Sequence, residues 1–142
     1  MTQIEFHFNA PDKLAYVCRL LRKASSMEKG LWVIAPDEVL QPLDAALWAV
    51  SSTDFVTHCH ASDDTLMGHS SVILSAACPS EGLLKTGIHL GEVCPNGFDR
   101  FARWIEVVST DPSDRALARQ RWKQYAAQGY ELQRKDLHLK AP

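Results

Sequence analysis

Residues 4–35 carry the pattern that most restricts the fold of this chain. Residues 4–8 alternate apolar and polar side chains, which is typical of a strand with one buried face. The segment from Pro11 to the residues before Gly30 then places apolar side chains at helical spacing: Leu14, Val17, Cys18 and Leu21. Residues 31–35 form a continuous apolar run, as in a strand that is covered on both faces. Together these segments predict a βαβ unit, in which a right-handed crossover joins a parallel pair of strands.

The middle of the chain continues this alternation of strands and helices. Asp37 can cap a short helical turn, and Pro42 suits the start of a second helix that runs to Trp48. Apolar content predicts further strands at residues 55–60, 72–76, 88–90 and 104–108. We also expect a polar loop at residues 63–71 and a short helical piece at residues 98–102. The whole chain, residues 1–142, is thus predicted to be one three-layer α/β domain with a mostly parallel central sheet flanked by helices.

Composition narrows the classes of function. The net charge is −2 and the isoelectric point is near 6.3, whereas broad binding to a phosphate backbone usually requires a strongly basic domain. No apolar run approaches the ~20 residues of a membrane span, and the first residues do not resemble a secretory signal. We therefore expect a cytoplasmic protein, without membrane association, whose four scattered cysteines are reduced thiols.

The best-delimited helix lies near the end of the chain. Asp111 can cap it, and Pro112 suits its first position because the missing N–H would be unpaired there anyway. Gly129 can end it, because glycine tolerates the left-handed backbone of a C-terminal cap. Arg121 falls toward the apolar side of this helix, so it should have a buried acidic or carbonyl partner.

The outward face of this helix combines positive charge with an aromatic ring. Four residues fall within an arc of about 100°: Arg115, Arg119, Trp122 and Lys123. The opposite, core side holds Leu117, Ala118 and Tyr125. One interpretation is a docking surface for a partner that is both acidic and apolar, with cations for its carboxylates and an indole as a pocket wall. The alternative is an ordinary solvated helix surface with the indole folded sideways into the core.

Two blocks of residues resemble a known family, the chi subunit of bacterial DNA polymerase III. The first is Ala118-Arg119-x-Arg121-Trp122-Lys123-x-Tyr125-x-x-x-Gly129-Tyr130-x-Leu132, which is similar to the family's C-terminal signature. The second is Leu43-Asp44-x-x-Leu47-Trp48, followed by Phe55-Val56-x-His58. The chain length and the order and separation of the blocks also fit the family.

This resemblance implies a non-catalytic adaptor in DNA replication. Such a protein links the clamp loader, through the small psi subunit, to the acidic C-terminal tail of single-stranded-DNA-binding protein, and meets single-stranded DNA only indirectly. The resemblance assigns psi binding to Trp48 and Phe55, although in isolation core packing is the better explanation of this pair. The resemblance also assigns binding of the tail to the cations and the indole of the last helix: Arg115, Arg119, Trp122 and Lys123. Gly129 and Tyr130 either line the same pocket or serve as helix cap and core.

Motifs for other chemistry are missing or incomplete. The sequence has no phosphate-binding G-x-x-x-x-G-K-[ST], no dinucleotide-binding G-x-G-x-x-G and no G-x-S-x-G, so we predict no cofactor. His58, Cys59 and His60 are the best metal candidates, but they lack closely paired further ligands, and we predict no metal. Two alternatives remain: a small hydrolase or nucleotide-using α/β enzyme with an unrecognised site, and a protein that binds single-stranded DNA directly through the last helix.

Overall fold

A seven-stranded parallel sheet forms the centre of the molecule in the computed structural model, which describes residues 2–25, 30–48, 58–60, 72–79 and 84–137. The strands are β1 (Gln3–Ala10), β2 (Leu31–Ile34), β3 (His58–His60), β4 (Val72–Ser75), β5 (Leu84–His89), β6 (Phe101–Ser109) and β7 (Leu132–Asp136). Their order is β3-β4-β2-β5-β6-β1-β7, and every neighbouring pair is parallel. The predicted α/β class is therefore confirmed.

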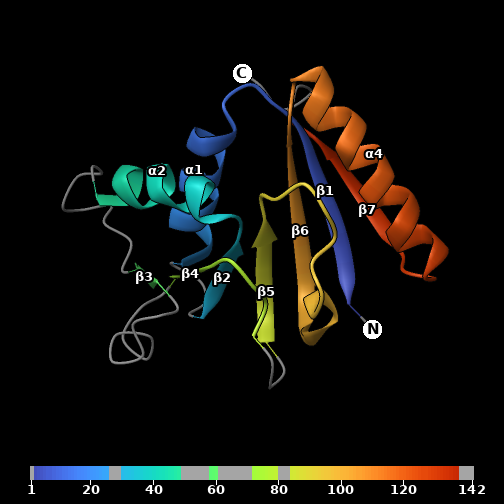
Figure 1. Ribbon diagram of the computed structural model, residues 1–142, viewed down its shortest axis with the longest axis horizontal. Coiled ribbons are helices and arrows are strands. Elements are labelled where there is room, and N and C mark those ends of the chain that lie inside the picture. Colours follow the sequence, from blue (N-terminus) through green and yellow to red (C-terminus); the bar gives the residue numbers. More distant parts are fainter. Residues whose placement is uncertain (1, 26–29, 49–57, 61–71, 80–83, 138–142) are drawn as a thin grey trace.

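Helices cover both faces of this sheet (Figure 1). On one face lie α1 (Lys13–Ser25) and α2 (Asp37–Trp48), whose apolar side chains share a buried cluster with β2, β4, β5 and β6. On the other face lies α4 (Pro112–Ala127), which shares a second cluster with β1, β6 and the 3-10 turn η1 (Phe98–Arg100). Alternate residues of the central strands supply the two clusters, because successive side chains of a strand point to opposite faces.

The expected pairing of the first two strands is wrong. Strands β1 and β2 are parallel, but β5 and β6 lie between them. The connection through α1 therefore passes over two strands that come later in the chain. Apolar periodicity determines which face of a strand is buried, but a crossover through a helix can reach strands at different distances. The neighbours of β1 are instead β6 and β7.

Two expected helix boundaries are also wrong. Pro42 does not begin a new helix but lies inside α2. Its missing N–H would have bonded to the carbonyl of Glu38, which lies on the exposed side where water can replace the lost donor. The helical piece ends at Arg100, because Phe101 already pairs with Leu84 as the first residue of β6. Of the expected strand at residues 55–60 only residues 58–60 are described, as β3, and the expected loop at residues 63–71 lies outside the described residues.

A polar cluster joins β1 to β6 on the face that carries α1. Arg103 of β6 donates to Glu5 of β1 through Nε (2.5 Å) and Nη2 (2.9 Å). The ring of His7 lies on the other side of this carboxylate, with Nε2 3.2 Å from Oε1 of Glu5. The hydrogen bonds to His7 and then to Arg103 lower the pKa of Glu5 to about 2. The ionised carboxylate therefore stabilises the contact between these strands.

We expect the substitution Glu5→Gln to flatten the dependence of stability on acid pH. A carboxyl whose pKa falls from its ordinary 4.5 to about 2 on folding stabilises the native state above pH 4.5, and this contribution disappears as the pH falls through 2. The free energies of unfolding of the variant and the parent protein should therefore differ at neutral pH and converge near pH 2. Urea denaturation across this pH range measures the difference. The same substitution at exposed Glu131 is the control, and parallel pH profiles for Glu5→Gln and the parent would contradict the prediction.

Candidate functional site

Both ends of α4 form as the sequence predicts. The carboxylate of Asp111 accepts a hydrogen bond from the backbone N–H of Ser113 (2.8 Å), and Pro112 is the first helical residue. At the other end Gly129 has a φ of +91°, the left-handed conformation that glycine adopts readily. Asp114 in the first turn also accepts hydrogen bonds from the backbone and hydroxyl of Ser109 (2.8 and 2.9 Å). These contacts fix the rotation of α4 on the sheet.

The buried stripe of α4 runs through Ala118, Arg121 and Tyr125. Leu117, which we expected on the core side, is only partly buried. Trp122 is also partly buried, and its ring centroid lies 5.1 Å from that of Phe6 in β1. The indole does not point fully outward, as the sequence had predicted, and it is not wholly buried either. It lies at the border between the buried stripe and the exposed side of the helix.

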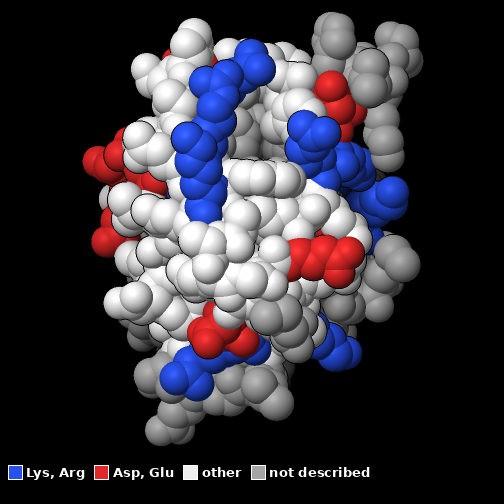
Figure 2. Space-filling view, turned by 90° about the vertical axis from the view of Figure 1, so that its right-hand side faces the viewer, with Lys and Arg blue, Asp and Glu red and all other residues white. Residues whose placement is uncertain are grey.

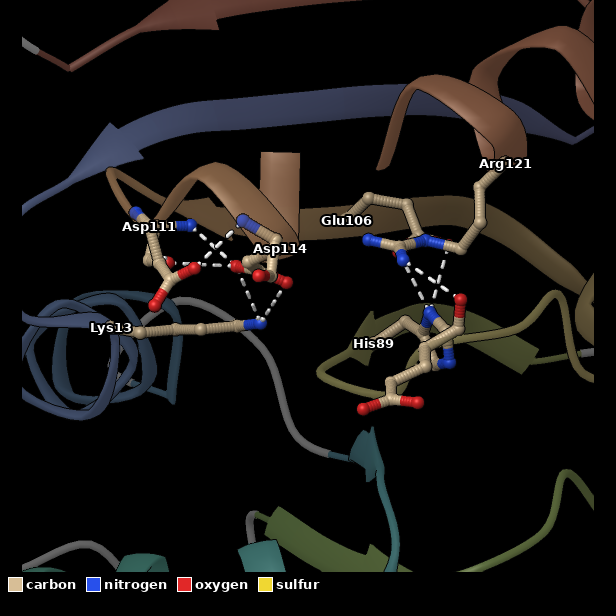
Figure 3. Close-up of polar contacts among 9 residues, drawn as sticks. Lys13, His89, Glu106, Asp111, Asp114 and Arg121 are labelled. Atoms are coloured by element: carbon tan, nitrogen blue, oxygen red, sulfur yellow. Dashed lines mark hydrogen bonds and ion pairs between the residues drawn. The ribbon is translucent and has the colours of Figure 1, made fainter. Parts of the chain in front are cut away.

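Arg121 has both kinds of partner that the sequence predicts, an acid and a carbonyl. Its Nε donates to the carboxylate of Glu106 in β6 (3.1 Å), and Nη1 donates to the backbone carbonyl of Glu92 (3.0 Å). Glu106 is fully buried, and Figure 3 shows Arg121 and His89 converging on it from different elements. Three further groups contact this carboxylate: His89 Nδ1 (2.7 Å), the hydroxyl of Tyr125 (2.5 Å) and Trp104 Nε1 (3.1 Å).

These partners keep the buried carboxylate ionised. Burial by itself raises the pKa of Glu106, but the combined effect of His89, Arg121 and Tyr125 lowers it. The pKa of Tyr125 rises, because of its burial and because the Glu106 carboxylate disfavours a second negative charge. The result is an ion pair between Glu106 and Arg121 that fixes the middle of α4 to the sheet.

A pocket of about 280 Å³ opens where α4 passes over the strands β1, β6 and β7. Its apolar lining consists of Phe6, Phe8, Val108, Ala118 and Trp122. Its charged lining consists of Arg115 and Arg119 from the helix and Arg134 from β7. Figure 2 shows this side of the molecule, where Lys and Arg side chains in the upper part of the view lie on both sides of uncharged surface. The pocket therefore combines apolar walls with cations on two sides.

The positive charges of the pocket are not neutralised from within. Among the described residues, none forms an ion pair or hydrogen bond with the side chain of Arg115, Arg119 or Arg134. All three residues are exposed, so that their guanidinium groups can reach a partner from solution. A ligand with carboxylates and an apolar side chain matches these properties.

The remaining residues expected in tail binding lie elsewhere. Lys123 is exposed beside Trp122 but does not line the pocket. Gly129 ends the helix, and Tyr130 packs its ring against Phe98, with centroids 5.2 Å apart, so neither lines the pocket. Arg134 was not predicted as a site residue, because no pattern in the sequence indicated strand β7. The segment Leu132–Asp136 is mostly polar and its burial does not alternate along the strand, so it lacks the pattern that indicates a strand.

Of the two residues expected in psi binding, Trp48 lies on the α1/α2 side of the molecule. Trp48 ends α2 and is 62% exposed, which is unusual for so large an apolar side chain. Phe55 lies outside the described residues, as do the side chains of His58, Cys59 and His60. Within the parts that are described, no three His, Cys, Asp or Glu residues are grouped as metal ligands, and no helix is long and apolar enough to cross a membrane.

Comparison with known proteins identifies the family. The family model of the DNA polymerase III chi subunit, HolC, matches residues 1–133. The chain belongs to this family. It is also similar to DNA polymerase III subunit chi of Pseudomonas aeruginosa, with 28% identity over 138 residues that cover 94% of this chain and 95% of the relative. Membership of this family implies partners within the DNA polymerase III assembly.

Two arginines of α4 should differ sharply in their effect on stability. The substitution Arg121→Gln leaves the buried Glu106 carboxylate without its counter-charge, so we expect a loss of about 3–5 kcal/mol in the free energy of unfolding. The substitution Arg119→Gln removes the same charge from an exposed position two residues away and should change stability by at most about 0.5 kcal/mol. Urea denaturation at neutral pH measures both values. Equal losses would contradict the structural role assigned to Arg121.

Proposed function

We propose that this chi subunit is a non-catalytic adaptor, and that its pocket beside α4 binds the acidic C-terminal tail of single-stranded-DNA-binding protein. The observation that carries the proposal is the coincidence of three unpaired guanidinium groups with an apolar pocket, among the described residues. Through a second surface the subunit binds psi, which attaches it to the clamp loader. The replicative polymerase is thereby connected to the protein that coats single-stranded DNA.

The pocket suits a tail that ends in an apolar residue. Its volume of about 280 Å³ lies just below the ~300–1,000 Å³ typical of ligand sites, so it fits one large side chain rather than a folded segment. Phe6 and Trp122 line the pocket with aromatic rings, while Arg115 and Arg119 supply positive charge for the acidic residues that precede the last one. Lys123 lies outside the pocket, where it contributes a weaker, longer-range attraction.

The second surface lies around Trp48. Helix α2 packs on the face of the sheet opposite α4, so Trp48 and the pocket are on different sides of the molecule (Figure 1). A large exposed aromatic side chain is a frequent anchor in protein interfaces. Trp48 therefore supports psi binding on the α2 side, and we assign Phe55 to the same surface from the family resemblance. With this arrangement the two partners can be bound at the same time.

The carboxyl ends of the strands give no support to a nucleotide-using enzyme. In open α/β sheets ligands bind where adjacent strands send their connections to opposite faces, which in this chain is the point between β1 and β6. Aspartates occupy both helix starts there: Asp12 accepts from the N–H of Ala15 (3.0 Å), and Asp111 caps α4. Lys13 and Asp114 form an ion pair across the same point (3.2 Å; Figure 3). These carboxylates would repel a phosphate group.

Binding of the tail should depend on charge at the pocket more than on charge nearby. We expect Arg119→Gln to weaken binding of a tail peptide roughly 10- to 100-fold, because it removes a hydrogen-bonded ion pair with the peptide. The substitution Lys123→Gln removes a positive charge outside the pocket and should lower the affinity for the peptide by less than about 5-fold. Fluorescence or calorimetric titration with the peptide measures the affinities of both variants. The same titration of the parent protein at low and high salt should show that its affinity falls as the ionic strength rises.

Two outcomes of this titration would contradict the tail-binding proposal. The first is unchanged affinity in Arg119→Gln, which would exclude the pocket as the site. The second is tight binding of a single-stranded oligonucleotide without any peptide, which would favour direct contact with DNA.

The psi surface should be separable from the pocket. The substitution Trp48→Ala removes an exposed aromatic anchor, so we expect it to weaken psi binding by at least 10-fold while tail affinity stays at the parent value. Pull-down with purified psi and peptide titration on the same preparation measure the two activities. Retention of psi by Trp48→Ala would contradict the assignment of this surface, and a loss of both activities would indicate a damaged fold.

A further inference from the structure

Strand β1, which lies between β6 and β7 (Figure 1), has one residue more than β6 near its carboxyl end. Its pairing with β6 is interrupted between His7 and Ala10. In this interval two residues of β1, Phe8 and Asn9, lie opposite a single residue of β6, Val108. On its other side β1 pairs with β7 without interruption as far as Phe8. The irregularity is therefore a β-bulge on the β6 side of the strand.

The extra residue changes the face of the sheet that the next side chain meets. Side chains alternate along a regular strand, so Phe8 and Ala10 would share a face without the bulge. Phe8 instead packs against the cluster beneath α4 and lines the pocket. Ala10 is fully buried in the cluster beneath α1 and α2, on the opposite face. The bulge thus allows β1 to supply the pocket wall and, two residues later, the core behind it.

The bulge depends on the backbone and the side chain of Asn9. Its φ is +66°, and no other non-glycine residue in the described part of the chain has a positive φ. Asparagine tolerates this left-handed conformation better than most residues, and β-branched residues tolerate it poorly. The amide of Asn9 also donates to the carboxylate of Asp136 in β7 (2.9 Å), and the N–H of Leu137 donates to the carbonyl of Phe8 (3.0 Å). These contacts fix the backbone of Phe8 relative to the edge strand.

We propose that Asn9 is a positioning residue for the pocket, because its left-handed backbone and its hydrogen bond to Asp136 place the ring of Phe8 in the apolar wall. Asn9 does not itself line the pocket, so it acts on a ligand only through Phe8. This inference rests on the proposed function of the pocket and adds a determinant of the affinity for an apolar side chain. Arg115 and Arg119 belong to α4, so their attraction for acidic residues does not depend on the bulge.

Two versions of one acidic tail peptide test this role, one with its large apolar last residue and one with alanine in that place. We expect Asn9→Val to weaken binding of the first peptide roughly 10-fold and of the second less than about 2-fold, because a β-branched residue disfavours the bulge and displaces Phe8 from the wall. Asn9→Gly should bind both peptides within about 3-fold of the parent, because glycine keeps the left-handed backbone. The matched control is Asn96→Val, the same substitution at an exposed residue without a positive φ, which should bind as the parent does.

The variant Phe8→Ala decides whether Asn9 acts through Phe8. It should itself weaken the first peptide about 10-fold, and Asn9→Val added to it should lower the affinity no further, whereas independent effects would add. If Asn9→Val does not fold, Asn9→Ala replaces it with the same expected pattern. Parent affinity in Asn9→Val or in Phe8→Ala, or additive losses in the double variant, would overturn the role of Asn9 and leave the proposed function intact. Failure of the parent to bind either peptide would overturn the proposed function and this inference together.

Discussion

The buried ion pair between Glu106 and Arg121 is the interaction on which the rest of this side of the molecule depends. A carboxylate that is fully removed from water is strongly unfavourable unless several donors satisfy it. Here the donors come from three elements: His89 from β5, Trp104 from β6, and Arg121 and Tyr125 from α4. The carboxylate can therefore be satisfied only when the helix lies in one position and one rotation on the sheet. This constraint also positions the pocket, because its lining residues Arg119 and Trp122 lie on either side of Arg121 in the helix.

Packing beneath the helix reinforces the same arrangement. The ring of Trp104 stacks on His89, with centroids 5.6 Å apart, and lies over Gly87 of β5. A Cβ atom at Gly87 would be 2.6 Å from the Trp104 ring, so only glycine allows this approach. The indole N–H of Trp104 is thereby directed at Glu106. Apolar packing and the polar cluster thus fix one another, which explains how a charged pair is accommodated inside the core.

The sequence predicts local features of this site better than its long-range geometry. Asp111, Pro112 and Gly129 mark the ends of α4 because capping depends on neighbouring residues. The need of Arg121 for a buried partner also follows from helical periodicity, although Glu106 itself could not be named. The order of the strands, and with it the separation of β1 from β2, depends on how the connecting helices pack across the sheet. Hydrophobic periodicity within single segments carries no information about this packing. For the same reason Arg134 was missed: its strand is short, half-exposed and stabilised mainly by pairing with β1.

The arrangement of the layers is compatible with the adaptor role proposed above for this parallel α/β sheet. Folds of this class usually place their ligands at the carboxyl ends of the strands, but here the aspartates and the pair of Lys13 with Asp114 fill the point between β1 and β6. The features that suit partners lie instead on the two layers of helices, the exposed Trp48 on one and the cationic pocket on the other. Because a rigid sheet separates them, a partner on one layer does not obstruct the other. We infer that the sheet acts as a spacer, and that specificity resides in the side chains which the outer helices and the edge strand β7 project from it.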